Sequence, residues 1–307
     1  MSLHQTSGRW RLGLALSLLT VLLWGILPIA LTVAVQAIDI YTVIWFRFLV
    51  SFLLLYIYLG IRGNLPKLEQ LGSDCGKLLA IATVFLAMNY FLFMQGLALT
   101  SPANAEVLIQ LSTLLLGLGG LLIFHERYRL YQWIGVSVLT CGYLLFFREQ
   151  LRNLITAHNT YILGSVLIVL AATAWAIYAL AQKQLLQSLS SSHIMLIIYG
   201  GCALLLTPVA RVKSVFTLDA LHLGVLIFCA LNTLIAYGAF AESLEHWEAS
   251  RVSAILALAP IVTLILVAVI SAIAPDLIPP ERFTFLGILG AGLVVIGSVA
   301  IALGKTD

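Results

Sequence analysis

Long apolar runs separated by short polar segments dominate the chain. A helix needs about 20 apolar residues to cross a bilayer, because each residue advances it by about 1.5 Å. Ten runs meet or approach this length, and turn-forming or charged residues separate them, as at 64–67 and 190–192. We therefore predict an all-α integral membrane protein with ten transmembrane helices. These cover residues 12–35, 41–61, 77–99, 102–124, 129–147, 161–183, 193–212, 219–241, 249–273 and 283–304.

Composition supports the same class of protein. Hydrophobic residues make up 62% of the 307 positions and charged residues only 9%, whereas soluble domains carry about 25% charged residues. The excess apolar surface must face lipid, because a soluble fold of this size could not hide it. The basic residues are scattered, which excludes a nucleic-acid-binding face. The first run, 12–35, is too long for the core of a signal peptide and is predicted to remain as the first helix.

Lysine and arginine positions predict the orientation. With the N-terminus inside, the inside segments of the first five spans hold seven Lys and Arg residues and the outside segments hold two. The second five spans give three on each side and decide nothing. By the positive-inside rule, we expect a multi-pass protein of the plasma (inner) membrane with both termini cytoplasmic.

An internal repeat divides the chain. The pattern Glu-Arg-x7-Gly-x6-Gly begins at Glu126 and again 155 residues later at Glu281. Trp24 is matched by Trp175 after 151 residues, and the stretch 97–113 by a stretch 147 residues later. We predict two five-helix repeats, residues 1–150 and 151–307. The glycines of the pattern are interpreted as helix-packing positions: Gly135, Gly142, Gly290 and Gly297.

Five spans is an odd number, so two such repeats must lie in opposite orientations. Inverted repeats give a physical route to alternating access around a site near the membrane midplane. A receptor does not need this symmetry.

The order of these features resembles the drug/metabolite transporter superfamily, and most closely its EamA-type branch of exporters of amino acids and related metabolites. The resemblance rests on Trp24-Gly25, Pro28, the acidic residue before the glycine pair, and Pro260 in the ninth span. It implies a central cavity lined by spans 1, 3, 4, 6, 8 and 9. Thr113 stands where the fourth span would carry the matching proline, which predicts a straighter helix there.

Two opposite charges fall inside predicted spans. Arg47 and Glu106 lie about 9 Å and 6 Å deep from the same side. We hypothesise that they pair or flank the outward mouth of a pathway; a structural ion pair, or Arg47 extending to the headgroups, are the alternatives. Gln110, Thr113 and Gly117 continue from Glu106 on one helix face, either as a cavity wall or as interhelical hydrogen-bonding groups.

Other polar and aromatic side chains lie at mid-membrane depth. Asn89 is a candidate substrate contact and Asn232 a candidate helix-packing residue. Trp24, Trp175 and Tyr178 could form an aromatic wall for a planar or cationic solute, or pack ordinarily. Tyr237 is a weaker candidate of the same kind.

The sequence predicts no catalytic residues, no cofactor and no metal site. It has no Walker A pattern, the four cysteines form no CxxC pair, and His125-Glu126 lacks the second histidine of HExxH. Glu242, Glu245, His246 and Glu248 could attract cations or form a solvated loop.

We predict a secondary transporter that exports small metabolites, namely amino acids or related solutes, by alternating access through a central cavity. Efflux of lipophilic cations is the alternative, and a membrane-embedded enzyme is the alternative from another class. Glu106 is the candidate for proton coupling, which a facilitator would not need. The expected partners are a small-molecule substrate and the bilayer, without nucleic acid, and one inverted pair allows a functional monomer.

Overall fold

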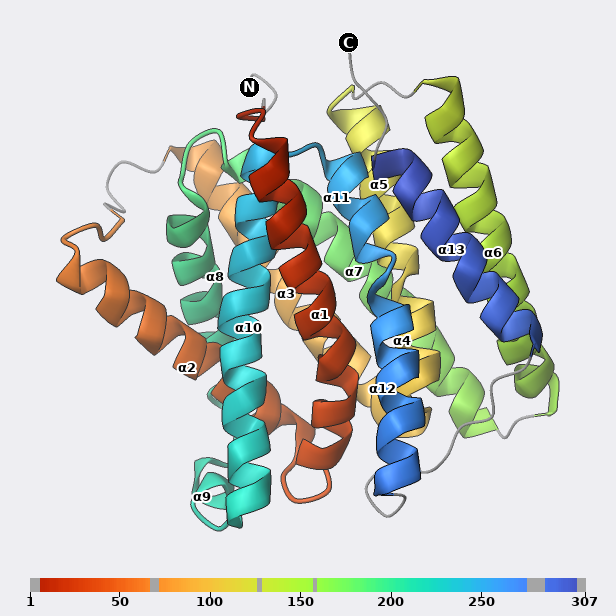
Figure 1. The fold of residues 1–307 in the computed structure, drawn as a ribbon. Helices are drawn as coiled ribbons and strands as arrows, with labels where there is room; N and C mark the ends of the chain where they lie inside the picture. Colours follow the sequence, from red (N-terminus) through yellow and green to blue (C-terminus); the bar gives the residue numbers. More distant parts are fainter. Residues whose placement is uncertain (1–5, 67–71, 126–128, 157–158, 275–284, 303–307) are drawn as a thin grey trace.

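A computed structural model of the chain describes residues 6–66, 72–125, 129–156, 159–274 and 285–302. Within these ranges it contains thirteen α-helices and no strand, which confirms the all-α class for this part of the chain (Figure 1). In chain order they are α1 (Trp10–Ala34), α2 (Ile40–Ile61), α3 (Ser73–Leu99), α4 (Pro102–Ile109), α5 (Leu111–Ile123), α6 (Leu130–Thr156), α7 (Asn159–Leu185), α8 (Ser191–Leu206), α9 (Val212–Val215), α10 (Ala220–His246), α11 (Ala249–Leu256), α12 (Ala259–Ile273) and α13 (Phe285–Ala302).

Seven helical segments of the described ranges are long and apolar enough to cross a membrane, judged by length and composition. They include two that join consecutive helices, Asn104–Ile123 and Ala249–Ile273. Three shorter apolar helices lie where the remaining predicted spans were placed: Leu130–Leu145, Ser191–Leu206 and Phe285–Ile301.

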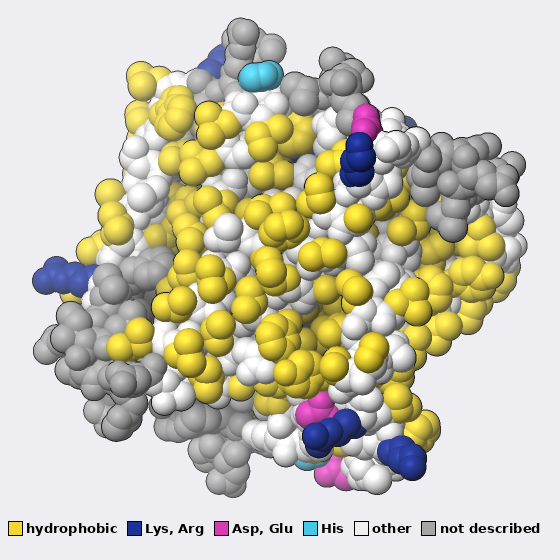
Figure 2. All heavy atoms as spheres, turned by 180° about the vertical axis from the view of Figure 1, so that it is seen from behind, with side chains coloured by type: hydrophobic (Ala, Val, Ile, Leu, Met, Phe, Trp, Pro, Cys, Tyr) yellow, Lys and Arg dark blue, Asp and Glu magenta, His cyan; other side chains and the backbone are white. Residues whose placement is uncertain are grey.

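The outer surface of the bundle is strongly apolar. Leu122 is 74% exposed and Leu204 is 76% exposed. Figure 2 shows hydrophobic side chains across the middle of one face, with the charged side chains toward its edges. This distribution suits a multi-pass protein whose sides contact hydrocarbon, because exposed apolar area of this extent is unfavourable in water.

Two of the membrane segments are broken near their middles. The first break, at Gln110, separates α4 from α5; the second, at 257–258, separates α11 from α12 and lies 147 residues later. Pro260 lacks the amide hydrogen that a continuous helix would use.

The predicted straighter fourth helix is wrong. The amide of Thr113 donates to the Gln110 carbonyl over 3.0 Å, a tighter i to i+3 bond. The Thr113 hydroxyl donates to the same carbonyl over 2.8 Å. Such local bonds compete with the helical ladder, so a threonine marks the break here as a proline does in the second half.

The packing partners are related by exchange of the two halves. α1 packs on α10 and α3 on α7, while α2 packs on α8, α4 on α12, α5 on α11 and α6 on α13. Exchanging the halves replaces α1 by α7, α3 by α10, α4 by α11 and α5 by α12. It therefore turns α1–α10 into α7–α3 and α4–α12 into α11–α5. The pairs α2–α8 and α6–α13 are each turned into themselves. The N-caps agree: Asp39 accepts from the Thr42 amide and Ser190, 151 residues later, from the His193 amide.

The α6–α13 crossing contains the glycines that the sequence assigned to packing. A Cβ on Gly142 would lie 2.7 Å from the Val294 nitrogen, and one on Gly297 would lie 2.5 Å from the Leu139 nitrogen. The Gly135 and Gly290 carbonyl oxygens lie against the same surfaces. Only glycine lets these two backbones approach so closely.

Candidate functional site

A cavity of about 80 Å³ lies in the middle of the bundle, where α1, α2, α3, α7 and α10 meet the two broken helices. Its lining on α1 begins at Trp24 and extends toward the C-terminal end of that helix, away from the face on which α1 begins and α10 ends, here called the N-terminal face. Eight of the nine predicted binding or charged side chains line it: Trp24, Arg47, Asn89, Glu106, Gln110, Thr113, Trp175 and Tyr237.

Tyr178 is the exception among the predicted residues. It is fully buried, and its hydroxyl lies 3.6 Å from the Met195 sulfur, outside the cavity wall. Its ring packs behind Trp175 and Tyr237 at centroid distances of 6.3 Å and 6.1 Å. Tyr178 therefore supports the wall from behind.

Arg47 is held inside the protein by two contacts. The side chain belongs to α2 and the residue is only 2% exposed, which rules out extension to the headgroups. Its Nε donates to the Thr233 hydroxyl on α10 over 2.9 Å. The guanidinium carbon lies 4.5 Å from the ring centroid of Tyr90 on α3, a cation–π distance. Three helices thus fix one buried cation.

Glu106, on α4, lines the same cavity and is 5% exposed. Its Oε1 accepts a hydrogen bond of 3.0 Å from the side-chain amide nitrogen of Gln110. Among the described residues, no lysine, arginine or histidine lies within ion-pair distance of its carboxylate. The predicted direct pair with Arg47 is therefore not formed, because Arg47 bonds Thr233 and Tyr90 instead.

The polar stripe on α4 and α5 only partly faces the cavity. Glu106, Gln110 and Thr113 line it, whereas Gly117 lines a second, mostly apolar pocket between α5, α6, α11 and α13. A Cβ on Gly117 would lie 2.9 Å from the Ser253 hydroxyl, so Gly117 serves close packing of the two broken helices. Thr113 lines both pockets, so the stripe leads from the central cavity into the second pocket along one turn of α5.

Three buried polar atoms of the lining have no hydrogen-bond partner in the described part of the chain. They are the indole nitrogen of Trp24, a donor, Oε1 of Gln110, an acceptor, and the hydroxyl of Tyr90, which can do either. A buried polar group left unpaired costs about 1–3 kcal/mol. A solute with both kinds of group would relieve the cost at both ends.

Aromatic rings close the cavity toward the N-terminal face. The Trp24 ring lies 5.5 Å from that of Trp175 and 5.0 Å from that of Tyr237. Phe240 joins them at 5.0 Å from Trp175. The sequence analysis missed Phe240 and Tyr90; Phe240 lies one helical turn after Tyr237, a spacing that could have identified it.

Asn89 and Asn232, two of the buried asparagines, tie equivalent helix pairs together. Asn89 lines the cavity and donates to the Ala171 carbonyl over 2.9 Å, from α3 to α7. Asn232 donates to the Leu23 carbonyl over 2.6 Å, from α10 to α1. The bond of Asn232 is of the kind that its predicted packing role requires.

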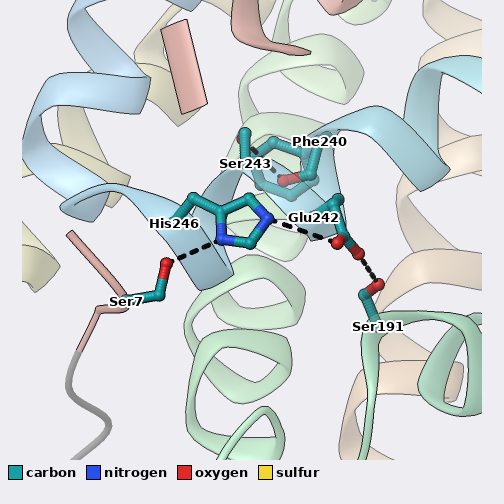
Figure 3. A network of polar contacts seen from close by, with 6 residues as sticks. All are labelled: Ser7, Ser191, Phe240, Glu242, Ser243 and His246. Atoms are coloured by element: carbon teal, nitrogen blue, oxygen red, sulfur yellow. Dashed lines mark hydrogen bonds and ion pairs between the residues drawn. The ribbon is translucent and has the colours of Figure 1, made fainter. Parts of the chain in front are cut away.

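A polar network lies at the N-terminal face (Figure 3). The Ser7 hydroxyl is 2.8 Å from Nδ1 of His246, and Nε2 of His246 is 3.3 Å from Glu242 Oε1. The other Glu242 oxygen accepts a hydrogen bond from Ser191 at the start of α8. The solvated-loop interpretation is wrong for His246, whose side chain is 6% exposed, because α10 continues through it into these contacts.

Comparison with known proteins gives the same picture of the chain. The sequence profile described as the EamA-like transporter family matches residues 11–148 and 162–303. "Uncharacterized inner membrane transporter YhbE" of Escherichia coli (strain K12) is 36% identical over 294 residues, covering 95% of this chain and 92% of that protein. An "Uncharacterized transporter" of Haemophilus influenzae is 34% identical and covers 95% of both chains.

More distant similarities extend over most of the chain. A protein of E. coli (strain K12) named "Probable amino-acid metabolite efflux pump" is 25% identical over 296 residues, with 92% of each chain covered. A solved crystal structure superposes with a TM-score of 0.71 at 16% identity, covering 95% of this chain and 98% of the other. At that identity the superposition speaks for the fold alone.

Proposed function

Because the chain belongs to the EamA-like transporter family, we propose that this membrane transporter is a secondary transporter that exports small metabolites, with amino acids and related solutes as its substrates. The observation that carries the proposal is the central cavity, where a buried cation, a buried carboxyl group and unpaired polar atoms converge. Transporter sites of this kind are formed by interrupted helices in corresponding positions of two halves.

Alternating access follows from the proposed inverted repeats of five spans each. Three observations support the repeats. The helix pairs that pack together are preserved when the two halves are exchanged, the two helix breaks lie 147 residues apart, and one family profile matches each half. Ten spans with both termini cytoplasmic complete the proposal. The three shorter apolar helices would then be spans that cross with less length.

The cluster of Trp24, Trp175, Tyr237 and Phe240, together with the network at the N-terminal face, would form the gate on the cytoplasmic side. Both lie between the cavity and that face. The contact between Ser191 and Glu242 bridges α8 and the end of α10, and opening toward the cytoplasm is proposed to separate these two elements. The state described here fits a transporter closed on that side.

Efflux of lipophilic cations is supported by the same tryptophans and Glu106. Arg47 opposes it, because a fixed cation in a cavity of about 80 Å³ repels a second one at short range. A zwitterion meets both fixed charges favourably, and for this reason we favour amino acids.

The test is counterflow in proteoliposomes that contain the purified protein. Vesicles are loaded with one unlabelled amino acid each, and uptake of the labelled form is followed against protein-free vesicles. We expect counterflow with at least one amino acid and competition by its relatives. Counterflow with tetraphenylphosphonium but with no amino acid would overturn the substrate proposal in favour of cation efflux.

A further inference from the structure

The structure points to a specific recognition task for Arg47, an inference that rests on the proposed function of the cavity. We propose that Arg47 binds the carboxylate of the substrate, and that Thr233 and Tyr90 hold its guanidinium in place for this purpose. The substrate class is thereby narrowed to solutes with a free carboxylate group.

Arg47 is a buried cation that has no acidic side chain beside it in the described part of the chain. Among the described residues, no Asp or Glu carboxylate lies within 4.0 Å of its nitrogen atoms, although the residue is 98% buried. Buried charges are normally paired with an opposite charge. The cavity that Arg47 lines offers the room for one, supplied by a ligand.

Thr233 and Tyr90, here called the clamp, leave the two terminal nitrogens of the guanidinium unused. Thr233 takes up Nε, and in the described part of the chain no hydrogen bond engages Nη1 or Nη2. These two groups form a planar fork that matches the two oxygens of a carboxylate. The face of the Tyr90 ring holds the plane of the fork from one side.

Thr233 is itself fixed, which makes it a positioning residue. Its hydroxyl donates to the Cys229 carbonyl over 2.9 Å, so the oxygen lone pairs are directed at Arg47. The Tyr199 hydroxyl donates to the Thr233 carbonyl over 2.9 Å and anchors this turn of α10 to α8. Thr233 is fully buried and does not line the cavity, so it acts only through Arg47.

Two other residues of the cavity lining offer groups that accept hydrogen bonds. The Glu106 carboxylate and the unpaired Oε1 of Gln110 suit an ammonium group. A solute that meets both Arg47 and these acceptors carries a carboxylate and an amine. Amides and decarboxylated amines retain the amine but lose the group that Arg47 recognises.

The experiment compares an amino acid that the wild-type protein transports with its amide and its decarboxylated amine in the same vesicles. We expect the wild type to prefer the free acid over the amide by about 10- to 100-fold in KM, the range of one charged hydrogen-bonded contact. Arg47→Gln should abolish this preference, and Arg47→Lys should keep part of it.

Thr233→Val and Thr233→Ser test the positioning role without touching the cavity wall. Valine removes the acceptor at similar volume and should lower the acid-over-amide preference, and serine should restore it. Thr173→Val is the matched control, because its exposed hydroxyl bonds only the Val169 carbonyl of its own helix. Thermal stability of each variant separates misfolding from altered selectivity.

The outcomes distinguish the two proposals. If the wild type transports no amino acid, the proposed function fails before Arg47 is tested. If it transports amino acids but folded Arg47→Gln or Thr233→Val keeps the wild-type preference for the free acid, the carboxylate assignment is overturned.

Discussion

The contact between Ser191 and Glu242 predicts how easily the cytoplasmic side opens. Ser191→Ala removes the donor at the start of α8 and leaves Glu242 bound to His246. The lost hydrogen bond to a carboxylate is worth about 1.5 kcal/mol at the lower end for charged groups. Because about 1.4 kcal/mol is a tenfold change in an equilibrium, the share of the opened state should rise roughly tenfold.

The assay measures labelling of a cysteine inside the cavity. Ser112→Cys, in a Cys141→Ser background, places a thiol on the wall without removing the Thr113 hydroxyl, while the other native cysteines are buried. A membrane-impermeant maleimide, added on the cytoplasmic side where both termini are proposed to lie, should label this thiol several-fold to tenfold faster in Ser191→Ala. Ser137→Ala is the control, because its exposed hydroxyl bonds only within its own helix. Equal rates in all backgrounds would refute the gating role.

Three further predictions test other parts of the structure. Gly142→Ala should destabilise the α6–α13 crossing by about 1–3 kcal/mol in thermal unfolding, whereas Gly292→Ala, with open space around its Cβ position, should not. Asp219 is the N-cap of α10, and its pKa is lowered by hydrogen bonds from His222, most by the one from the backbone amide and next by the one from the side chain. The cap should therefore stabilise the fold at pH values above the ordinary aspartate pKa, and this stabilisation should be lost as the pH falls through the lowered pKa. In unfolding temperatures measured over a pH series, Asp219→Asn should remove this loss at acidic pH. Transport driven by an imposed pH gradient should disappear in Glu106→Gln, and a retained response would exclude Glu106 as the proton carrier.

The apolar helices and the repeated pattern were readable from the sequence because they depend on local composition and spacing. Apolar length decides whether a helix can span a bilayer, whatever its neighbours are. The repeat was visible in Trp24 and Trp175 and in the paired glycine pattern. These same regularities led to the side chains that line the cavity, because polar groups at membrane depth rarely face lipid.

The partner of each buried polar group depended on the tertiary structure. Arg47 and Glu106 have similar depth and opposite sign, yet Arg47 bonds Thr233, 186 positions away along the chain. The break at Gln110 has no proline, and it depends on where the Thr113 hydroxyl bonds. Neither contact has a pattern in the sequence that could predict it.

By itself, the sequence indicated the apolar segments, the repeated pattern and the polar residues that fall within those segments. Only the tertiary structure decided which faces of those helices meet, and so which side chains form the cavity, the clamp around Arg47 and the network at His246. The physical reason is the solvent. Lipid tails are as apolar as leucine, so hydrophobicity gives little information about which face turns inward. Close packing at glycines and a few hydrogen bonds between distant helices make that choice.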